Sequence, residues 1–245
     1  MDYPSIIRNY SKALKENIPL KDKLLLLSIF QVMYRFFDAE NSSYKVLHAS
    51  AAISNEGNTI LFGDDGKDSI GKTFCSLLLA SKSSLYISDE YCLINPLTNS
   101  IFGNASIPIN LKGETAKFFK DSGLKSFNNE RIIFADDYFR ESTESTIDFI
   151  VIPYMNSDKS KIEVPDSDET RYLYKSTMFG HNAKLLNPEL DKVSLLTSKD
   201  TVDPINMSAA LASYPDINLK IPLVKMYIKE PTDTFEMLED IQNGG

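Results

Sequence analysis

The sequence is poor in the side chains that bind transition metals. Its 245 residues include two histidines and two cysteines. The cysteines, Cys75 and Cys92, show no metal-ligand spacing and both lie in apolar segments. We therefore expect buried free thiols, as in a reducing cytoplasm. With so few histidines, the composition also argues against zinc chemistry.

Positive charge and long apolar runs are scarce as well. The formal net charge is −8, which argues against a nucleic-acid backbone or an anionic membrane surface as the main partner. The most apolar stretch, residues 24–37, is too short for a membrane span and is interrupted by Gln31 and Arg35. The N-terminus is polar and shows no signal peptide. These features predict a cytoplasmic protein.

Residues 66–73 fit the phosphate-binding pattern G-x-x-x-x-G-K-[ST], with Gly66, Gly71, Lys72 and Thr73 at the fixed positions. Glycine lets backbone N–H groups approach a polyphosphate, the lysine reaches the outer phosphates and the hydroxyl binds Mg²⁺. An apolar run of strand type precedes the loop, and a run of helical composition follows it. This order places phosphates at a helix N-terminus. The pattern predicts a nucleoside triphosphate ligand.

Two adjacent acids, Asp89 and Glu90, follow the next predicted strand. A carboxylate at the end of a strand beside a phosphate loop can hold Mg²⁺, directly or through water, or accept a proton from an attacking hydroxyl. The simpler interpretation is that these acids end a strand in solvent. The phosphate-binding pattern shortly upstream favours the functional interpretation.

The distribution of apolar runs predicts an α/β protein with a mixed sheet flanked by helices, built from hairpins as well as βα units. Helices are expected at 5–37 (as two helices separated near Pro19), 113–121, 168–178, 205–213 and 232–241. Strands are expected at 46–53, 59–62, 85–88, 91–94, 107–111, 132–135, 148–153 and 224–228, with a hairpin turn at 95–99. Polar or acid-rich loops are expected at 120–129, 136–144 and 157–170, the last of them mobile.

The segment 24–37 is too apolar for a free surface helix. We expect it to pack on the domain itself. The alternative is that it contacts a partner chain or a second copy of this protein.

Several of these elements occur together in one known family. They are His48-Ala49-Ser50, the loop from Gly63 to Thr73, the strand that ends in Asp89-Glu90, and the segment 107–112. Over roughly residues 46–112 the chain resembles the catalytic core of HPr kinase, which has the phosphoenolpyruvate-carboxykinase-like P-loop fold. The resemblance implies an N-terminal helical segment, 1–40, followed by a P-loop kinase-like domain, 41–245, similar to the C-terminal domain of HPr kinase.

The resemblance also implies an ATP-dependent kinase that uses Mg²⁺ and transfers the γ-phosphate to a hydroxyl. Lys72 would bind the β- and γ-phosphates together with the loop residues Gly63, Gly66, Ser69, Ile70 and Gly71. Lys112 is a candidate second cation over the γ-phosphate. The alternative for Lys112 is a solvated surface lysine.

The remaining roles implied by the resemblance concern the metal and the proton. Thr73 and Glu90 would hold Mg²⁺. Asp89 would accept the proton of the attacking hydroxyl, and His48 would orient Asp89 or a transferring oxygen. Without the neighbouring pattern, His48 would be interpreted as a core histidine.

Small kinases that resemble this fold phosphorylate serine hydroxyls in peptides, so the implied acceptor is a hydroxyl, foremost serine, of a peptide or a small molecule. The loop is longer than the family's, and Asp64, Asp65 and Asp68 bring negative charge close to a polyanion. The large N-terminal domain of HPr kinases has no counterpart here, so we do not expect HPr to be the acceptor.

Two other functions stay open. The lengthened acidic loop is compatible with a catalytically degenerate nucleotide-binding or scaffold protein of the same fold. A lyase or carboxykinase of this fold has less support, because no further His/Asp metal set is visible. We expect the segments 136–144 and 157–170 to be ordinary solvated loops. The alternative is that one of them closes over the acceptor.

Overall fold

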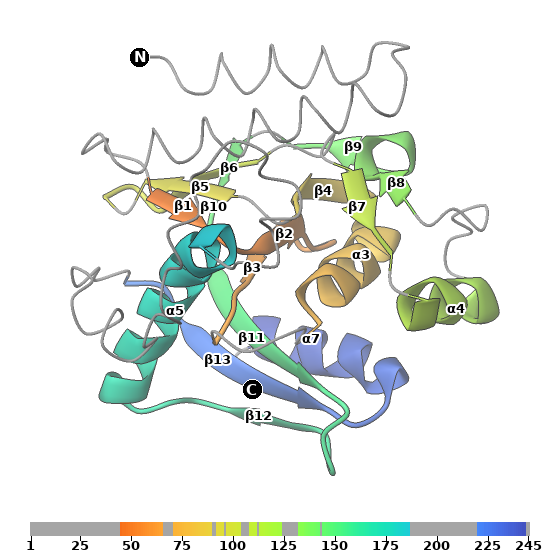
Figure 1. Cartoon of the computed structure of the whole chain (residues 1–245). Helices are drawn as coiled ribbons and strands as arrows, with labels where there is room; N and C mark the ends of the chain where they lie inside the picture. The colour runs from red at the N-terminus through yellow and green to blue at the C-terminus, as the bar shows by residue number, and fades with distance from the viewer. Residues whose placement is uncertain are drawn as a thin grey trace.

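The computed structural model describes most of the domain predicted downstream of residue 40 (Figure 1). The described residues are 45–65, 71–89, 92–95, 97–103, 108–111, 113–123, 132–142, 144–186 and 220–243. The helices predicted at 5–37 and 205–213, and the partner surface predicted at 24–37, lie outside them. Within the described residues, no helix is long and apolar enough to cross a membrane.

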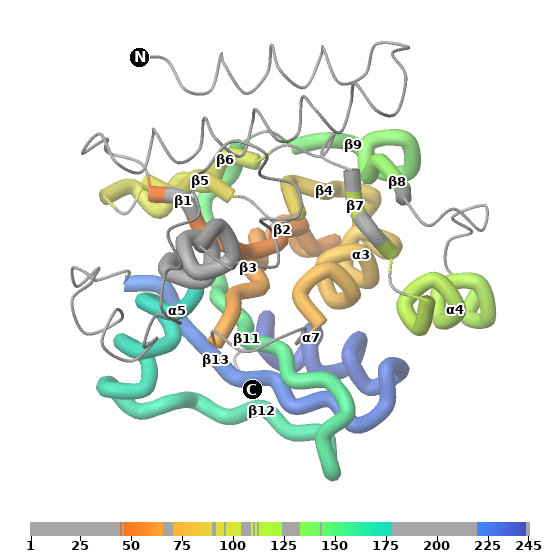
Figure 2. Tube along the Cα trace, in the orientation of Figure 1, coloured from red at the N-terminus to blue at the C-terminus, as the bar shows by residue number. Residues whose placement is uncertain are grey.

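A seven-stranded mixed sheet forms the centre of the protein (Figure 1; Figure 2). Its strands, in spatial order, are β12 (Lys161–Glu163), β13 (Leu223–Ile228), β11 (Phe149–Met155), β3 (Thr59–Phe62), β2 (Ser50–Ile53), β4 (Leu85–Ser88) and β9 (Arg140–Glu141). Strands β3, β11 and β13 are parallel neighbours, whereas β2 and β12 run antiparallel to the strands beside them. The predicted mixed α/β architecture is therefore confirmed.

Both faces of this sheet are covered. One face packs against α3 (Lys72–Ser83), α4 (Gly113–Ser122), α7 (Thr234–Gln242) and the antiparallel pair of β7 (Pro108–Asn110) and β8 (Ile132–Phe134). The other face packs against α5 (Ser167–Leu186) and a small antiparallel sheet of β1 (Lys45–Leu47), β5 (Cys92–Asn95), β6 (Ser100–Phe102) and β10 (Glu144–Thr146). Burial on both faces explains why the central strands are continuous apolar runs rather than alternating ones.

Most local predictions agree with the observed elements. Strands β3 and β4 have the predicted bounds, and β5, β7, β8, β11 and β13 differ from prediction by one or two residues at one or both ends. The turn at 95–99 joins β5 to β6 as an antiparallel hairpin. The helix expected at 113–121 is α4, and the one at 232–241 is the short 3₁₀ turn η3 (Pro231–Asp233) followed by α7.

The single strand predicted at 46–53 is wrong. It is two strands, β1 and β2, interrupted at His48 and Ala49. Strand β1 pairs with β5 in the small sheet, whereas β2 pairs with β3 and β4 in the large one. The chain therefore changes sheets at His48, and local hydrophobicity carries no information about that change.

The predicted loops at 157–170 and 136–144 are also corrected. The first contains β12 and the start of α5, and the second contains most of the 3₁₀ turn η1 (Ala135–Asp137), β9 and the start of β10. Strand β12 is a polar edge strand, as is common at sheet edges. Lys225 of β13 donates to Glu163 of β12, and to Glu169 of α5 at 2.7 Å. These charge pairs act together with Ile162, which packs against the core, to hold β12 against β13.

Candidate functional site

The strand directions bring three chain segments to one edge of the large sheet. Because β2 is antiparallel to both β3 and β4, its beginning lies beside their ends, with Ser50 opposite Phe62 and Ala51 opposite Ser88. His48 lies two residues before the start of β2, while Asp64 and Asp89 follow β3 and β4. Ligands of open α/β sheets bind outside the carboxyl ends of the strands. This edge is therefore the candidate functional site.

Helix α3 begins at this edge, directly after Gly71. Gly71 has φ 101 and ψ 11, in the left-handed region. A Cβ at this position would lie 2.6 Å from Met155 Cγ at the end of β11. Only glycine combines this backbone conformation with such a close approach. The strand before the predicted loop and the helix after it are thus present, with Gly71 at the start of the helix, whereas residues 66–70 lie outside the described part of the chain. The first turn of α3 directs its N–H groups to the sheet edge.

We expect Gly71→Ala to reduce the free energy of unfolding by about 2–3 kcal/mol, from left-handed backbone strain plus contact with Met155. Gly57→Ala is the matched control, because Gly57 has φ 88 but open space around its Cβ position. We expect that variant to reduce the free energy of unfolding by about 1 kcal/mol. Urea unfolding of both proteins measures the difference. Equal losses would show that Met155 moves aside without cost.

The first turn of α3 is hydrogen-bonded to the end of β4. Thr73 Oγ1 donates to Asp89, at 2.9 Å from Oδ1 and 3.2 Å from Oδ2. Asp89 is 4 % exposed. The contact joins two residues that were singled out separately in the sequence, and it places a hydroxyl and a carboxylate, both oxygen ligands, side by side.

Lys72 and His48 share one oxygen of Asp64. Lys72 Nζ donates to Asp64 Oδ2, and His48 Nδ1 lies 2.9 Å from the same oxygen. The side chains of Lys72, Asp64 and His48 are 11 %, 5 % and 1 % exposed. Burial alone would raise the pKa of Asp64, but the close contact with His48 and the charge of Lys72 outweigh burial and hold this pKa well below 3.8. Asp64 is therefore ionised, and it neutralises Lys72.

The neighbouring acid, Asp65, is also turned into the protein. It is 3 % exposed, and the Tyr172 hydroxyl donates to its carbonyl oxygen at 3.4 Å. Burial, together with the charge of Asp65 beside it, raises the pKa of Tyr154 above its ordinary value. The two acids of Gly63-Asp64-Asp65 that looked unfavourable beside a polyanion are thus held by partners within the fold.

Gly63 has a packing role that the sequence did not suggest. A Cβ on Gly63 would lie 2.6 Å from Thr177 Oγ1 and 2.8 Å from Ile152 Cδ1. Thr177 belongs to α5 and Ile152 to β11. The missing side chain at this position therefore lets α5 approach the start of the loop. This close packing explains why residue 63 is glycine, and phosphate binding is not needed to explain it.

The described residues include six of the predicted site residues: His48, Gly63, Gly71, Lys72, Thr73 and Asp89. The other five, Gly66, Ser69, Ile70, Glu90 and Lys112, lie outside the described part of the chain. Sequence reasoning missed Asp64 and Thr177 as site residues. Among the described residues, no group of three or more His, Cys, Asp or Glu side chains could hold a metal ion.

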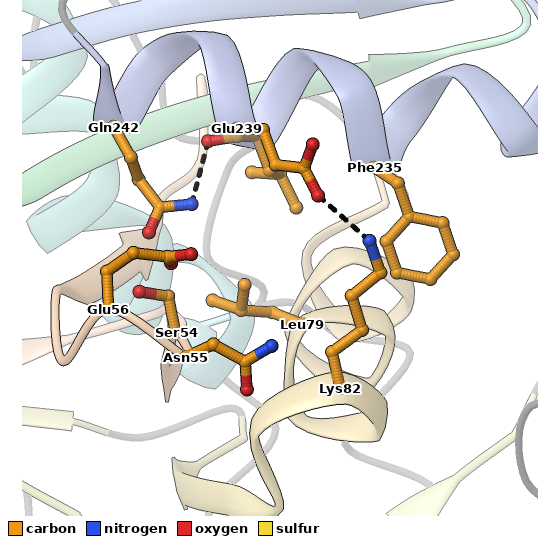
Figure 3. Close-up of a pocket in the computed structure, with 9 residues that line it drawn as sticks. Ser54, Asn55, Glu56, Leu79, Lys82, Phe235, Glu239 and Gln242 are labelled. Carbon is orange, nitrogen blue, oxygen red and sulfur yellow. Dashed lines mark hydrogen bonds and ion pairs between the residues drawn. The ribbon is translucent and has the colours of Figure 1, made fainter.

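A pocket is present at the other end of α3 (Figure 3). It lies between the β2–β3 turn, α3 and α7, about 15 Å along the helix from Lys72. Lys82 Nζ is 3.0 Å from Glu239 Oε1 and 4.0 Å from the centre of the Phe235 ring. Lys82 is the one cation among the described residues that line the pocket, and it already has these partners. We therefore interpret the pocket as part of the contact between α3 and α7 and not as a second candidate site.

No protein-family model matches this chain, and no curated protein matches it.

Proposed function

We propose that this protein is a Mg²⁺- and ATP-dependent kinase that transfers the γ-phosphate to a hydroxyl, foremost serine, of a peptide or small molecule. The observation that carries the proposal is the hydrogen bond from Thr73 to Asp89 at the start of α3, directly after Gly71-Lys72. At this sheet edge a helix N-terminus, a lysine, a hydroxyl and a carboxylate lie together, and phosphoryl transfer uses these four kinds of group.

The spacing of the Thr73 and Asp89 oxygens fits Mg²⁺. An octahedral Mg²⁺ ion binds oxygen at about 2.0–2.1 Å, so two adjacent ligands lie about 2.9 Å apart. Thr73 Oγ1 and Asp89 Oδ1 are 2.9 Å apart. We therefore assign Thr73 and Asp89 as the residues that would hold the ion, with Glu90 as a further candidate. The bound ion would neutralise charge on the transferred phosphoryl group.

The other residues would position the phosphates. Lys72 and the N–H groups of the first turn of α3 supply positive charge where the β- and γ-phosphates would bind. Asp89, buried at the end of β4, can also accept the proton of an attacking hydroxyl. Phosphoryl transfer depends mainly on positioning and electrostatic stabilisation, so these few groups are sufficient. We propose the cytoplasm as the compartment, where Cys75 and Cys92 would persist as the buried free thiols observed.

Thr73→Val tests the observation that carries the proposal. Valine keeps the shape of threonine but lacks the hydroxyl, so we expect at least about tenfold weaker binding of ATP in the presence of Mg²⁺. Binding of ATP in EDTA should be unchanged. Thr73→Ser keeps the hydroxyl and should behave as wild type. Calorimetric titration with and without Mg²⁺ makes the measurement, and a wild-type protein that binds no ATP would overturn the proposal.

The second candidate is a nucleotide-binding protein without catalysis, and the pairing of Lys72 with Asp64 favours it. In that function the lysine stays neutralised by Asp64 and the phosphates bind through N–H groups and Mg²⁺ alone. Transfer of label from γ-labelled ATP to a serine-containing peptide library or to small hydroxyl compounds separates the two functions. A kinase labels an acceptor or hydrolyses ATP slowly, whereas a sensor binds ATP and returns it unchanged.

A further inference from the structure

One residue of α5, Thr177, contacts the candidate site at three main-chain atoms. Its Oγ1 accepts the N–H of Asp64 at 3.0 Å and donates to the carbonyl oxygen of Asp64, also at 3.0 Å. Its own carbonyl oxygen accepts the N–H of His48 at 3.0 Å. Thr177 is 3 % exposed. A single side chain thus satisfies both main-chain polar groups of Asp64, and the same residue fixes the start of the His48 segment.

The packing around Thr177 leaves this arrangement little freedom. Its Oγ1 occupies the space where a side chain on residue 63 would lie, so Gly63 is required for the contact. Gly63 N–H donates to the carbonyl oxygen of Val151 on β11 at 2.9 Å. The first residues after β3 are therefore held between β11 and α5, and Asp64 can move only if Thr177 moves or loses its hydroxyl bonds.

The Asp64 side chain connects this constrained main chain to Lys72. Because Asp64 Oδ2 accepts from Lys72 and also lies 2.9 Å from His48 Nδ1, the position of the Asp64 main chain sets where the Lys72 ammonium group lies. Thr177 does not touch Lys72 in any described contact. Its influence on the lysine must pass through Asp64.

We infer that Thr177 is a positioning residue for nucleotide binding, acting through Asp64 on Lys72 and through its carbonyl group on His48. The inference depends on the proposed function, because it concerns the same site. It adds a residue of α5, far from the phosphate-binding pattern in the sequence, to the elements that determine affinity for ATP.

The test compares three single variants in calorimetric titrations with Mg²⁺-ATP. Thr177→Val keeps the shape of the side chain and removes both hydroxyl bonds, so we expect about tenfold weaker binding. Thr177→Ser keeps the hydroxyl and should bind within about twofold of wild type. Thr234→Val is the matched control, because the buried Thr234 hydroxyl has no hydrogen-bond partner in the described part of the chain. It should bind as wild type does.

A double-mutant cycle with Asp64→Asn distinguishes positioning from a general loss of stability. If Thr177 acts through the Asp64 carboxylate, Thr177→Val should change the affinity by less than about threefold in the Asp64→Asn background, against about tenfold in wild type. A merely structural role predicts the same fold-change in both backgrounds. Thermal unfolding of each variant without nucleotide identifies any protein that is not folded at the assay temperature, and that variant is titrated at a lower temperature.

The outcomes separate the two proposals. A wild-type protein that binds no Mg²⁺-ATP overturns the proposed function and this inference with it. If wild type binds but Thr177→Val binds as tightly as Thr234→Val, the inference alone is wrong. The same holds if Thr177→Ser fails to restore binding, or if the loss is equal in the Asp64→Asn background.

Discussion

Asp89→Asn is expected to lower the rate of phosphoryl transfer by at least about a hundredfold, and up to about ten-thousandfold. Asparagine has the shape of aspartate and can still accept the Thr73 hydroxyl, but it has no charge and cannot accept a proton. Steady-state turnover with ATP and the best hydroxyl acceptor measures the effect. Asp89 is 4 % exposed, and Thr73 is hydrogen-bonded to it, so the substitution changes charge at a fixed position.

Magnesium dependence separates the two roles of Asp89. If Asp89 mainly holds the ion, raising Mg²⁺ should recover much of the lost rate, because weaker affinity is overcome by concentration. If it mainly accepts the proton, the rate stays low at saturating Mg²⁺ and ATP affinity is retained. A variant with full turnover at low Mg²⁺ would exclude both roles.

Asp148→Asn is the control for this experiment. Asp148 also accepts a hydrogen bond at a strand end, from the Thr59 N–H at 2.8 Å, but at the opposite end of β3. Its substitution removes a hydrogen-bonded carboxylate of the same large sheet without altering the sheet edge where α3 begins. We expect turnover within about twofold of wild type, because the residue has no place in the proposed chemistry.

The part of the site that could be predicted from the sequence is the part formed by neighbours along the chain. β3 and the start of α3 follow from an apolar run, from Gly71 and from Lys72-Thr73, and each of these signals lies within a few residues of the element it defines. The position of Asp89 also follows, because it ends the next strand. The structure has these elements where the sequence predicted them.

Contacts between distant segments could not be predicted in this way. Thr177 lies 113 residues from Asp64, on a helix whose pattern gives no reason to connect it with a phosphate-binding loop. Asp64 itself was interpreted as an unfavourable charge, because the sequence does not show that Lys72 and His48 lie against its carboxylate. The change of sheet at His48 has the same cause, since pairing partners are determined by the whole fold.

Lys72→Ala is expected to reduce the free energy of unfolding by about 2–3 kcal/mol in the absence of any nucleotide. The alanine removes the ammonium group that balances the charge of the buried Asp64 carboxylate, and burying a charge with less compensation is costly. Asp64→Asn alone should reduce the free energy of unfolding by less, about 1 kcal/mol, because the long Lys72 side chain can place its ammonium group in water. Urea unfolding at pH 7 measures both variants.

The double variant Lys72→Ala/Asp64→Asn should be more stable than Lys72→Ala, since the buried charge is gone, and the cycle should give a coupling of about 2 kcal/mol. Strictly additive losses would contradict the ion pair. Such a result would mean that Lys72 and Asp64 do not interact in solution, and that the lysine is available to phosphates in the empty protein.

Lowering the pH should weaken this coupling between Lys72 and Asp64. The pKa of Asp64 in the folded protein lies below its ordinary value of 3.8, because the contacts with His48 and Lys72 outweigh the effect of burial. A carboxyl with a lowered pKa stabilises the fold fully above the unfolded value, and this contribution is lost as the pH falls towards the folded value. The stability difference between wild type and Asp64→Asn should therefore be constant from pH 7 to about pH 5 and shrink below pH 4. The same carboxylate holds the lysine that would bind phosphates. If the stability difference is unchanged at pH 3, the Asp64 carboxylate does not hold Lys72, and Thr177 cannot act on Lys72 through it.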